Sequence, residues 1–213
     1  MKKSDDSYSM IRESSSVYSA DRPEKLFSID DYYALPDDRR VELIDGVFYD
    51  MAAPGYVHQA ALGELYSLFR ECIQQHHMAC QAFVSPCDVR LDRDDYTMVQ
   101  PDMIVICGKS KAELIRAARY EGAPDLVVEI LSPSTRTRDQ YLKLHKYRHA
   151  GVREYWIVDI DHQTVIIHQF NSKDDCTSER YSFTDAIPVA ISDNQCSIDF
   201  SRVLEAIREY YDN

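Results

Sequence analysis

A single glutamate inside an apolar segment constrains this chain more than any other feature. Residues 126–131 read Leu-Val-Val-Glu-Ile-Leu and lie between Pro124 and Pro133. A short run of branched apolar residues with such boundaries is typical of a buried strand. Glu129 lies in the middle of this run. Because a buried carboxylate is costly unless it is paired or bound to a metal, the strand predicts a polar site inside the fold.

A helix is expected directly after this strand. Residues 137–140 (Thr-Arg-Asp-Gln) have the spacing of a capping box, and Gly151 supplies a helix stop. Asp139, Lys143 and Tyr147 follow one another at four-residue steps, so they share one face of that helix. An acid in a strand and a lysine on the next helix together indicate part of a polar site.

The rest of the chain alternates between helical and strand patterns, which predicts one mixed α/β domain over residues 26–213, with a central mixed β-sheet flanked by helices. Residues 1–25 show no periodicity and are expected to form a flexible arm. The expected elements are a helix at 28–36, a hairpin at 40–51 turning at Asp45-Gly46, a long helix at 56–77, strands at 81–91, 99–107, 152–159, 164–170 and 179–183, and helices at 110–118 and 201–211.

Length and composition fit a protein that folds around its own core. The chain has 213 residues, of which 45% are hydrophobic, and this is enough for one domain with a sizeable core. No apolar run follows the basic first residues, and no segment approaches the roughly 20 apolar residues that cross a bilayer, so no signal peptide and no membrane partner are expected. The six cysteines form no C-x-x-C pair, which favours free thiols and a cytoplasmic location.

The net charge of −12 argues against a protein that coats nucleic acid without specificity. Basic residues nevertheless gather in two segments, and these are either ordinary solvated helix faces or a surface that faces phosphates. The first segment holds Arg136, Arg138, Lys143, Lys146, Arg148 and Arg153, and the second holds Lys109, Lys111, Arg116 and Arg119.

Three acids fall in or beside predicted strands: Glu42, Asp102 and Glu129. If these strands are neighbours, the three carboxylates and Lys143 converge at one end of the sheet, and the carboxylates repel one another. A divalent cation relieves such repulsion, and oxygen ligands alone suit Mg²⁺ or Mn²⁺. His58, near the start of the long helix, is expected to have a capping or surface role rather than a site role.

Four separated motifs resemble one known family. These are VELIDGVFYDMAAPGYVHQ, QPDMIVI, APDLVVEILSPST, and D-x-x-x-K-x-x-x-Y followed by GVREYWIVD. They look like the Uma-type putative restriction endonucleases over roughly residues 28–170. That family belongs to the PD-(D/E)XK nuclease superfamily. The resemblance implies a restriction-endonuclease-like core and metal-dependent cleavage of phosphodiester bonds.

The resemblance also assigns roles to residues. Asp102 corresponds to the aspartate of the Pro-Asp motif, Glu129 to the second acid, and Glu42 to an extra acid from the N-terminal part. The superfamily lysine normally follows the second acid by two residues, where this chain has Leu131; Lys143 on the following helix is expected to replace it. All four are therefore expected to be catalytic, with Asp102, Glu129 and Glu42 as ligands of Mg²⁺ or Mn²⁺.

Three functions fit the sequence. The first is a metal-dependent endonuclease acting on DNA, and the second is an inactive nuclease fold that binds nucleic acid or protein. The third is a glycosidase with Glu129 and Asp102 as acid and base, but this leaves the lysine and the Pro-Asp motif without a role. The first is favoured.

A homodimer is expected because a double-strand cut needs two sites, with the aromatic strand at 154–159 as its interface. The residues expected to contact DNA are Arg136, Arg138, Lys146, Lys109 and Lys111.

Overall fold

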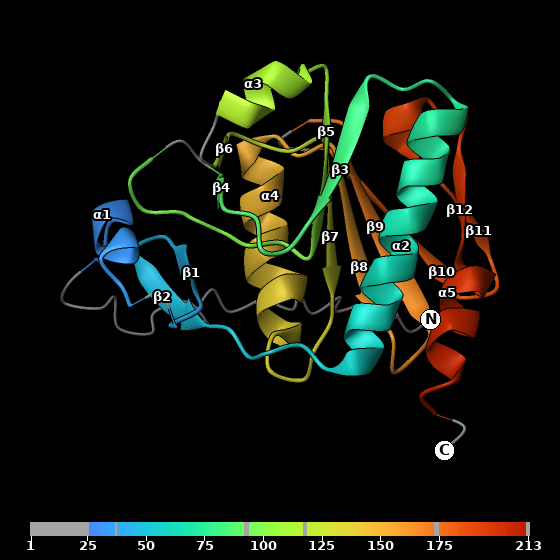
Figure 1. Ribbon diagram of the computed structural model, residues 1–213, viewed down its shortest axis with the longest axis horizontal. Coiled ribbons are helices and arrows are strands. Elements are labelled where there is room, and N and C mark those ends of the chain that lie inside the picture. Colours follow the sequence, from blue (N-terminus) through green and yellow to red (C-terminus); the bar gives the residue numbers. More distant parts are fainter. Residues whose placement is uncertain (1–25, 37, 92–93, 117–118, 173–174, 212–213) are drawn as a thin grey trace, which may run out of the picture.

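The computed structural model describes residues 26–211, except residues 37, 92–93, 117–118 and 173–174. Its centre is a six-stranded mixed sheet with the strand order β10-β9-β8-β7-β5-β3 (Figure 1). The prediction of a mixed α/β fold is confirmed, whereas the arm predicted at residues 1–25 lies outside the described residues. The strands are β3 (Cys80–Val84), β5 (Met103–Cys107), β7 (Leu126–Ile130), β8 (Glu154–Asp159), β9 (Thr164–Phe170) and β10 (Cys176–Ser182).

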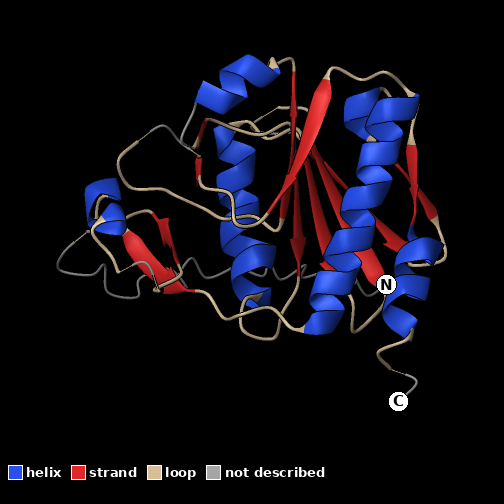
Figure 2. Cartoon of the chain, viewed as in Figure 1, coloured by secondary structure: helices blue, strands red, loops and turns tan. Residues whose placement is uncertain are grey.

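Helices cover both faces of this sheet (Figure 2). The long helix α2 (Tyr56–Gln75) packs on one face together with α5 (Phe200–Arg208), and its buried apolar stripe meets Val128 and Trp156. The segment η1 (Arg138–Lys143) and the helix α4 (Leu144–Ala150) cover the other face, where Val127 and Tyr155 are buried. Successive residues of β7 and β8 thus point to opposite cores, as the pleat requires.

A small hairpin stands beside the central sheet. It consists of β1 (Val41–Ile44) and β2 (Val47–Asp50), and its turn is Asp45-Gly46, as predicted. The N–H and C=O groups of Leu43 pair with Met98, which ties the hairpin to the loop before β5. The helix α1 (Ile29–Tyr33) precedes it and begins with a capping box at Ser28. The shorter elements are β4 (Val89–Arg90), α3 (Lys111–Arg116), β6 (Tyr120–Glu121), β11 (Ala186–Pro188), η2 (Ala190–Ser192) and β12 (Ser197–Asp199).

Several local predictions need correction. The side chain of Thr137 makes no capping hydrogen bond, and η1 is a π-helix rather than the start of an ordinary α-helix. The strand expected at 81–91 is interrupted after Val84, where the peptide bond between Ser85 and Pro86 is cis. The strand β8 cannot be a dimer interface, because all six of its residues are buried and it pairs with β7 and β9 inside the sheet.

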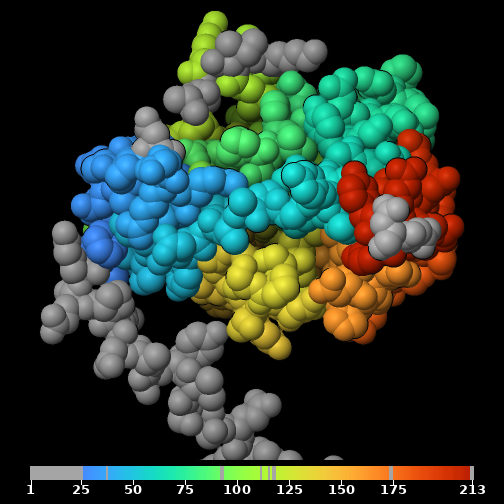
Figure 3. All heavy atoms as spheres, turned by 60° about the horizontal axis from the view of Figure 1, so that its bottom comes forward, coloured from blue at the N-terminus to red at the C-terminus, as the bar shows by residue number. Residues whose placement is uncertain are grey.

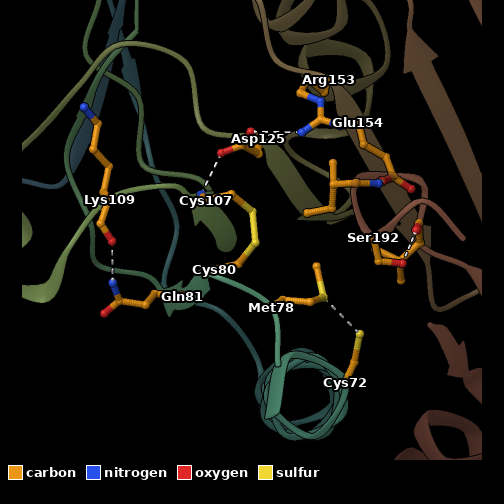
Figure 4. Close-up of a disulfide and its surroundings, with 12 residues drawn as sticks. Cys72, Met78, Cys80, Gln81, Cys107, Lys109, Asp125, Arg153, Glu154 and Ser192 are labelled. Carbon is orange, nitrogen blue, oxygen red and sulfur yellow. Dashed lines mark hydrogen bonds and ion pairs between the residues drawn. A yellow bond between two sulfur atoms is a disulfide. The ribbon is translucent and has the colours of Figure 1, made fainter. Parts of the chain in front are cut away.

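The prediction of free thiols is wrong for four of the six cysteines. Two disulfides join Cys72 to Cys196 and Cys80 to Cys107. Figure 4 shows the second pair, whose cysteines lie opposite each other where β3 pairs with β5, and also Cys72 beside Met78. Partners this far apart in the chain meet only through the fold. Within the part of the chain that the structure describes, no helix is long and apolar enough to cross a membrane.

Candidate active site

A cavity of about 680 Å³ opens at the end of the inner strands, where β7 ends and β5 begins. The first turns of α2 and η1 complete its wall, so four elements bring polar side chains to one place. In Figure 3 this end of the sheet comes forward, and the cyan segment leading into α2 lies next to the yellow segment leading into η1. The titratable side chains around the cavity include His58, Asp102, Glu129, Asp139 and Lys143.

Asp102 and Glu129 meet through the pairing of β5 with β7. These strands are antiparallel, with Met103 opposite Val128, and continuing this register by one residue sets Asp102 opposite Glu129. The Oδ2 atom of Asp102 accepts a hydrogen bond of 2.8 Å from the N–H of Ile130, the residue after Glu129. The expectation that these two strands are neighbours is therefore confirmed.

Lys143 reaches the same place from η1. Its Nζ atom lies 2.7 Å from Oε1 of Glu129, 2.8 Å from Oε1 of Glu42 and 3.5 Å from Oδ1 of Asp139. Burial lowers the pKa of this ammonium, but the three carboxylates outweigh burial and raise it. Lys143 is only 2% exposed. A lysine held in this way stays protonated, so it can donate hydrogen bonds but cannot act as a general base.

Glu129 is buried at 4% exposure and accepts two hydrogen bonds on one oxygen. Lys143 donates to Oε1 at 2.7 Å, and the hydroxyl of Tyr147 donates to the same atom at 2.7 Å. Burial raises the pKa of Glu129 well above its ordinary value, Lys143 lowers it, and the nearby acids raise it again. With both donors on Oε1, Oε2 is the oxygen that can turn to a ligand in the cavity.

Glu42 comes from the hairpin and has no exposed surface. Its Oε1 atom forms an ion pair with Nζ of Lys143 at 2.8 Å and accepts a hydrogen bond of 2.9 Å from the N–H of Gln100. Glu42 is not among the described residues that line the cavity. These contacts are those of a carboxylate that positions Lys143, and the role of Glu42 as a metal ligand stays a prediction.

His58 is a site residue that sequence reasoning did not favour. It lies in the first turn of α2, and its Nε2 atom is 3.2 Å from Oδ2 of Asp102. Burial lowers the pKa of His58, but Asp102 raises it above the ordinary value through a hydrogen bond and its charge. The sequence signal available was a lone histidine just after the hairpin motif, at the start of a long helix.

Asp139 is the second residue beyond the predicted set. It lines the cavity at 2% exposure, one step before Lys143 on the face that also holds Tyr147. Burial raises the pKa of its carboxyl, while Lys143 and a hydrogen bond with Thr135 lower it. Its place on the same helical face as Lys143 was visible in the sequence.

The five basic residues expected at DNA do not gather in one place. Arg138 lines the cavity, whereas Arg136 pairs with Asp159 and Lys146 lies 2.7 Å from Asp45. Lys109 and Lys111 follow the end of β5, whereas the cavity lies where β5 begins, and α3, which starts at Lys111, lies beyond the end of that strand in Figure 1. Contact of these residues with DNA stays a prediction.

Unpaired polar atoms are concentrated at this site. Eight buried side-chain nitrogen or oxygen atoms of the described residues lack a hydrogen-bond partner; five of them belong to residues that line the cavity, and a sixth belongs to Glu42, beside Lys143. Most buried polar atoms in proteins have a partner, so such a concentration indicates a place for a ligand or for ordered water. The six atoms are Glu42 Oε2, His58 Nδ1, Gln100 Oε1, Arg138 Nε and Nη2, and Asp139 Oδ1.

The fit to a metal ion is partial. The carboxylates of Asp102 and Glu129 are hard oxygen ligands of the kind that Mg²⁺ and Mn²⁺ prefer, and both line the cavity. Among the described residues, no three His, Cys, Asp or Glu side chains are already arranged to hold a metal. Asp102 and Glu129 would therefore need further ligands from water or from a substrate, which is usual for Mg²⁺.

Comparison with known proteins supports the fold and assigns the chain to a family. The fold is similar to the crystal structure of a putative nuclease belonging to DUF820 from Anabaena variabilis, with a TM-score of 0.69 and 20% sequence identity. The alignment covers 85% of this chain and 99% of that chain. No curated protein matches the sequence. The family described as Uma2, putative restriction endonuclease, matches residues 29–198. That match spans most of the sequence, and the chain therefore belongs to the Uma2 family.

Proposed function

We propose that this protein is a metal-dependent endonuclease that hydrolyses phosphodiester bonds in DNA. The observation that carries the proposal is the meeting of Asp102, Glu129 and the buried Lys143 at one cavity. Neighbouring strands supply the two carboxylates, and Lys143 contributes a fixed positive charge beside them. The family membership of the chain supports nuclease chemistry at this site.

Each residue has a role in this proposal. A Mg²⁺ or Mn²⁺ ion bound by Asp102 and Glu129 would polarise the phosphate and lower the pKa of a bound water. Lys143 would hold Glu129 in place and donate a hydrogen bond toward negative charge that develops during reaction. His58 would fix the orientation of Asp102, which it contacts through Nε2. Glu42 would keep Lys143 protonated and in position.

The test is a cleavage assay on supercoiled plasmid and on linear duplex DNA, with Mg²⁺, with Mn²⁺ and with a chelator. Cleavage is expected with either metal and not with the chelator. Wild-type protein that leaves DNA intact under all these conditions would contradict the proposal. Single-stranded DNA and RNA of the same sequence then establish which nucleic acid is preferred.

A second candidate is a nuclease fold that binds nucleic acid without cutting it. One observation favours it: the ammonium of Lys143 already lies among Glu42, Glu129 and Asp139, which is where a metal would compete for the same carboxylates. This candidate predicts DNA binding that neither metal nor the loss of Glu129 changes. Affinity measured with and without Mn²⁺ separates the two functions.

The sequence also led us to propose a homodimer in the cytoplasm. A duplex cut on both strands needs two sites, so the dimer belongs with the endonuclease proposal. Its interface must lie elsewhere than β8, which is inside the sheet. Sedimentation velocity with and without duplex DNA tests the dimer, and a protein that stays monomeric on DNA would contradict it.

A further inference from the structure

We infer that Arg138 binds a phosphate group of the substrate inside the cavity, beside Lys143 and Glu129. This inference rests on the proposed function, because it names the residue that would hold the backbone of DNA at that site. Arg138 is the first residue of η1, so the π-helix that carries Lys143 also carries this guanidinium to the cavity wall.

The surroundings of Arg138 fix its side chain in place. The carbon at the centre of its guanidinium lies 5.4 Å from the centre of the Tyr49 ring, within the range of a cation–π contact. Its Nε atom lies 3.6 Å from Oε2 of Glu42, and the side chain is only 11% exposed. Tyr49 and Glu42 both belong to the hairpin, so β1 and β2 hold the arginine from one side.

The guanidinium nevertheless has hydrogen bonds left to donate. Its Nε and Nη2 atoms are buried and have no hydrogen-bond partner among the described residues. A buried donor without an acceptor is unfavourable, so an acceptor bound in the cavity would stabilise this arrangement. A small movement toward Glu42 could satisfy Nε, but Nη2 would still need an acceptor.

A phosphate is the acceptor that this position suits. The planar fork of an arginine matches two oxygens of a phosphate, and such charge-assisted pairs are the stronger hydrogen bonds in proteins. The other buried cation, Lys143, is already surrounded by carboxylates. Arg138 is therefore a cation of the cavity wall with two buried donors, Nε and Nη2, that no described residue accepts.

Arg136 provides a matched control two residues earlier. Arg136 is not among the described residues that line the cavity, and its guanidinium pairs with both oxygens of Asp159, with a further contact of 3.5 Å to Asp161. Both arginines carry the same charge and lie close in the chain. They differ in whether the guanidinium is free to bind an outside anion.

The experiment measures binding of a short fluorescent DNA duplex at several salt concentrations, in a Glu129→Gln background that does not cleave. Adding Arg138→Gln is expected to lower affinity about 10-fold or more and to reduce the salt slope by about 0.9, the value for one phosphate contact. Adding Arg136→Gln is expected to change affinity less than threefold. Arg138→Lys keeps the charge without the fork, so it is expected to keep the slope and lose affinity.

Three results would overturn the inference: Arg138→Gln without effect on affinity, equal losses from the two arginine substitutions, or Arg138→Lys with the reduced slope of Arg138→Gln. Circular dichroism of each variant checks that the fold is retained. If Arg138→Gln does not fold, the affinity and salt slope of Arg138→Lys provide the test instead. Cleavage by the wild type is measured separately. Its absence would count against the proposed function, whereas the binding comparison tests Arg138 alone.

Discussion

Two buried glutamates on neighbouring strands show how differently one residue type can be used. Glu154 in β8 has no exposed surface, and N–H groups surround its carboxylate: Trp156 donates at 2.8 Å, Ala190 at 3.3 Å and Ile191 at 3.1 Å. Glu129 in β7 is bound by a charged lysine and a tyrosine hydroxyl, next to other acids. Burial raises the pKa of both.

The difference lies in what surrounds each carboxylate. Neutral N–H donors hold Glu154, away from the cavity, and they make it a structural link between β8 and η2. Glu129 lies on the cavity wall within a cluster whose charges and unpaired atoms a ligand could change. A buried acid is therefore not by itself a sign of chemistry, since its partners decide the role.

The largest expected effect is on the rate of DNA cleavage, when the charge of Glu129 is removed and the same change at Glu154 serves as the control. Glu129→Gln is expected to lower the rate of DNA cleavage by about 1,000-fold or more, because it removes a metal ligand and the partner of Lys143. Glu154→Gln is expected to leave the rate within about threefold and to lower the melting temperature, because the amide turns a donor toward other donors. Equal loss of activity in the two variants would abolish the contrast.

Lys143 gives the next largest effect, and here stability is the measurement. Lys143→Ala leaves buried carboxylates without their cation, so unfolding in urea is expected to need about 3 kcal/mol less free energy, as when one partner of a buried pair is removed. Lys146→Ala is the control: its pair with Asp45 is largely exposed on the Asp45 side, and about 1 kcal/mol or less is expected. Similar losses in both would show that the cluster is not tightly coupled.

The disulfide between Cys72 and Cys196 should affect Glu154 rather than Glu129. The N–H of Cys196 donates to Oγ of Ser192 and its C=O accepts from the N–H of Val189, next to the residues that donate to Glu154. Cys196→Ser is expected to cost about 2–4 kcal/mol and to speed hydrogen exchange at the amide of Ile191. The pairing of Lys143 with Glu129 is expected to persist. Faster exchange at Ile130 instead would contradict this division.

The smallest expected effect is a pH dependence at Asp159. Burial would raise the pKa of this carboxyl, but hydrogen bonds from Arg136 and His162 lower it to about 2. A lowered folded-state pKa gives stability that is present above the unfolded value of about 3.9 and is lost as the pH falls through about 2. Asp159→Asn is expected to lower the free energy of unfolding by roughly 2 kcal/mol at pH 7. In urea unfolding at a series of pH values, the variant is also expected to lose less stability than the wild type as the pH falls between those two values.

Much of the fold follows from patterns that act over a few residues. The apolar run around Glu129, the capping box at Ser28 and the turn at Asp45-Gly46 depend on neighbours in the chain, and all three are present. The four-residue steps that place Asp139 and Lys143 on one face also hold, because both are buried at the site. Periodicity therefore gave the face of the helix that meets the strand.

The remaining features depend on residues that are distant in sequence. Cys72 and Cys196 are 124 residues apart, and no local pattern pairs them. His58 reaches Asp102 only because α2 begins beside β5. Arg136 and Arg138 look equivalent in sequence, but Arg136 precedes η1 and pairs with Asp159, whereas Arg138 begins η1 and lines the cavity. Sequence reasoning could not separate the two.

The position of the lysine also makes assembly of the site conditional. In the superfamily pattern that the sequence resembles, acid and lysine stand on one strand, whereas here Lys143 comes from η1 and the position two residues after Glu129 holds the apolar Leu131. Undocking of η1 and α4 would separate the lysine from its acid while β7 stayed in the sheet. A chain still completing its fold would thus lack the pairing of Lys143 with Glu129, and under the proposed function the capacity to cut DNA would arise only with the finished molecule.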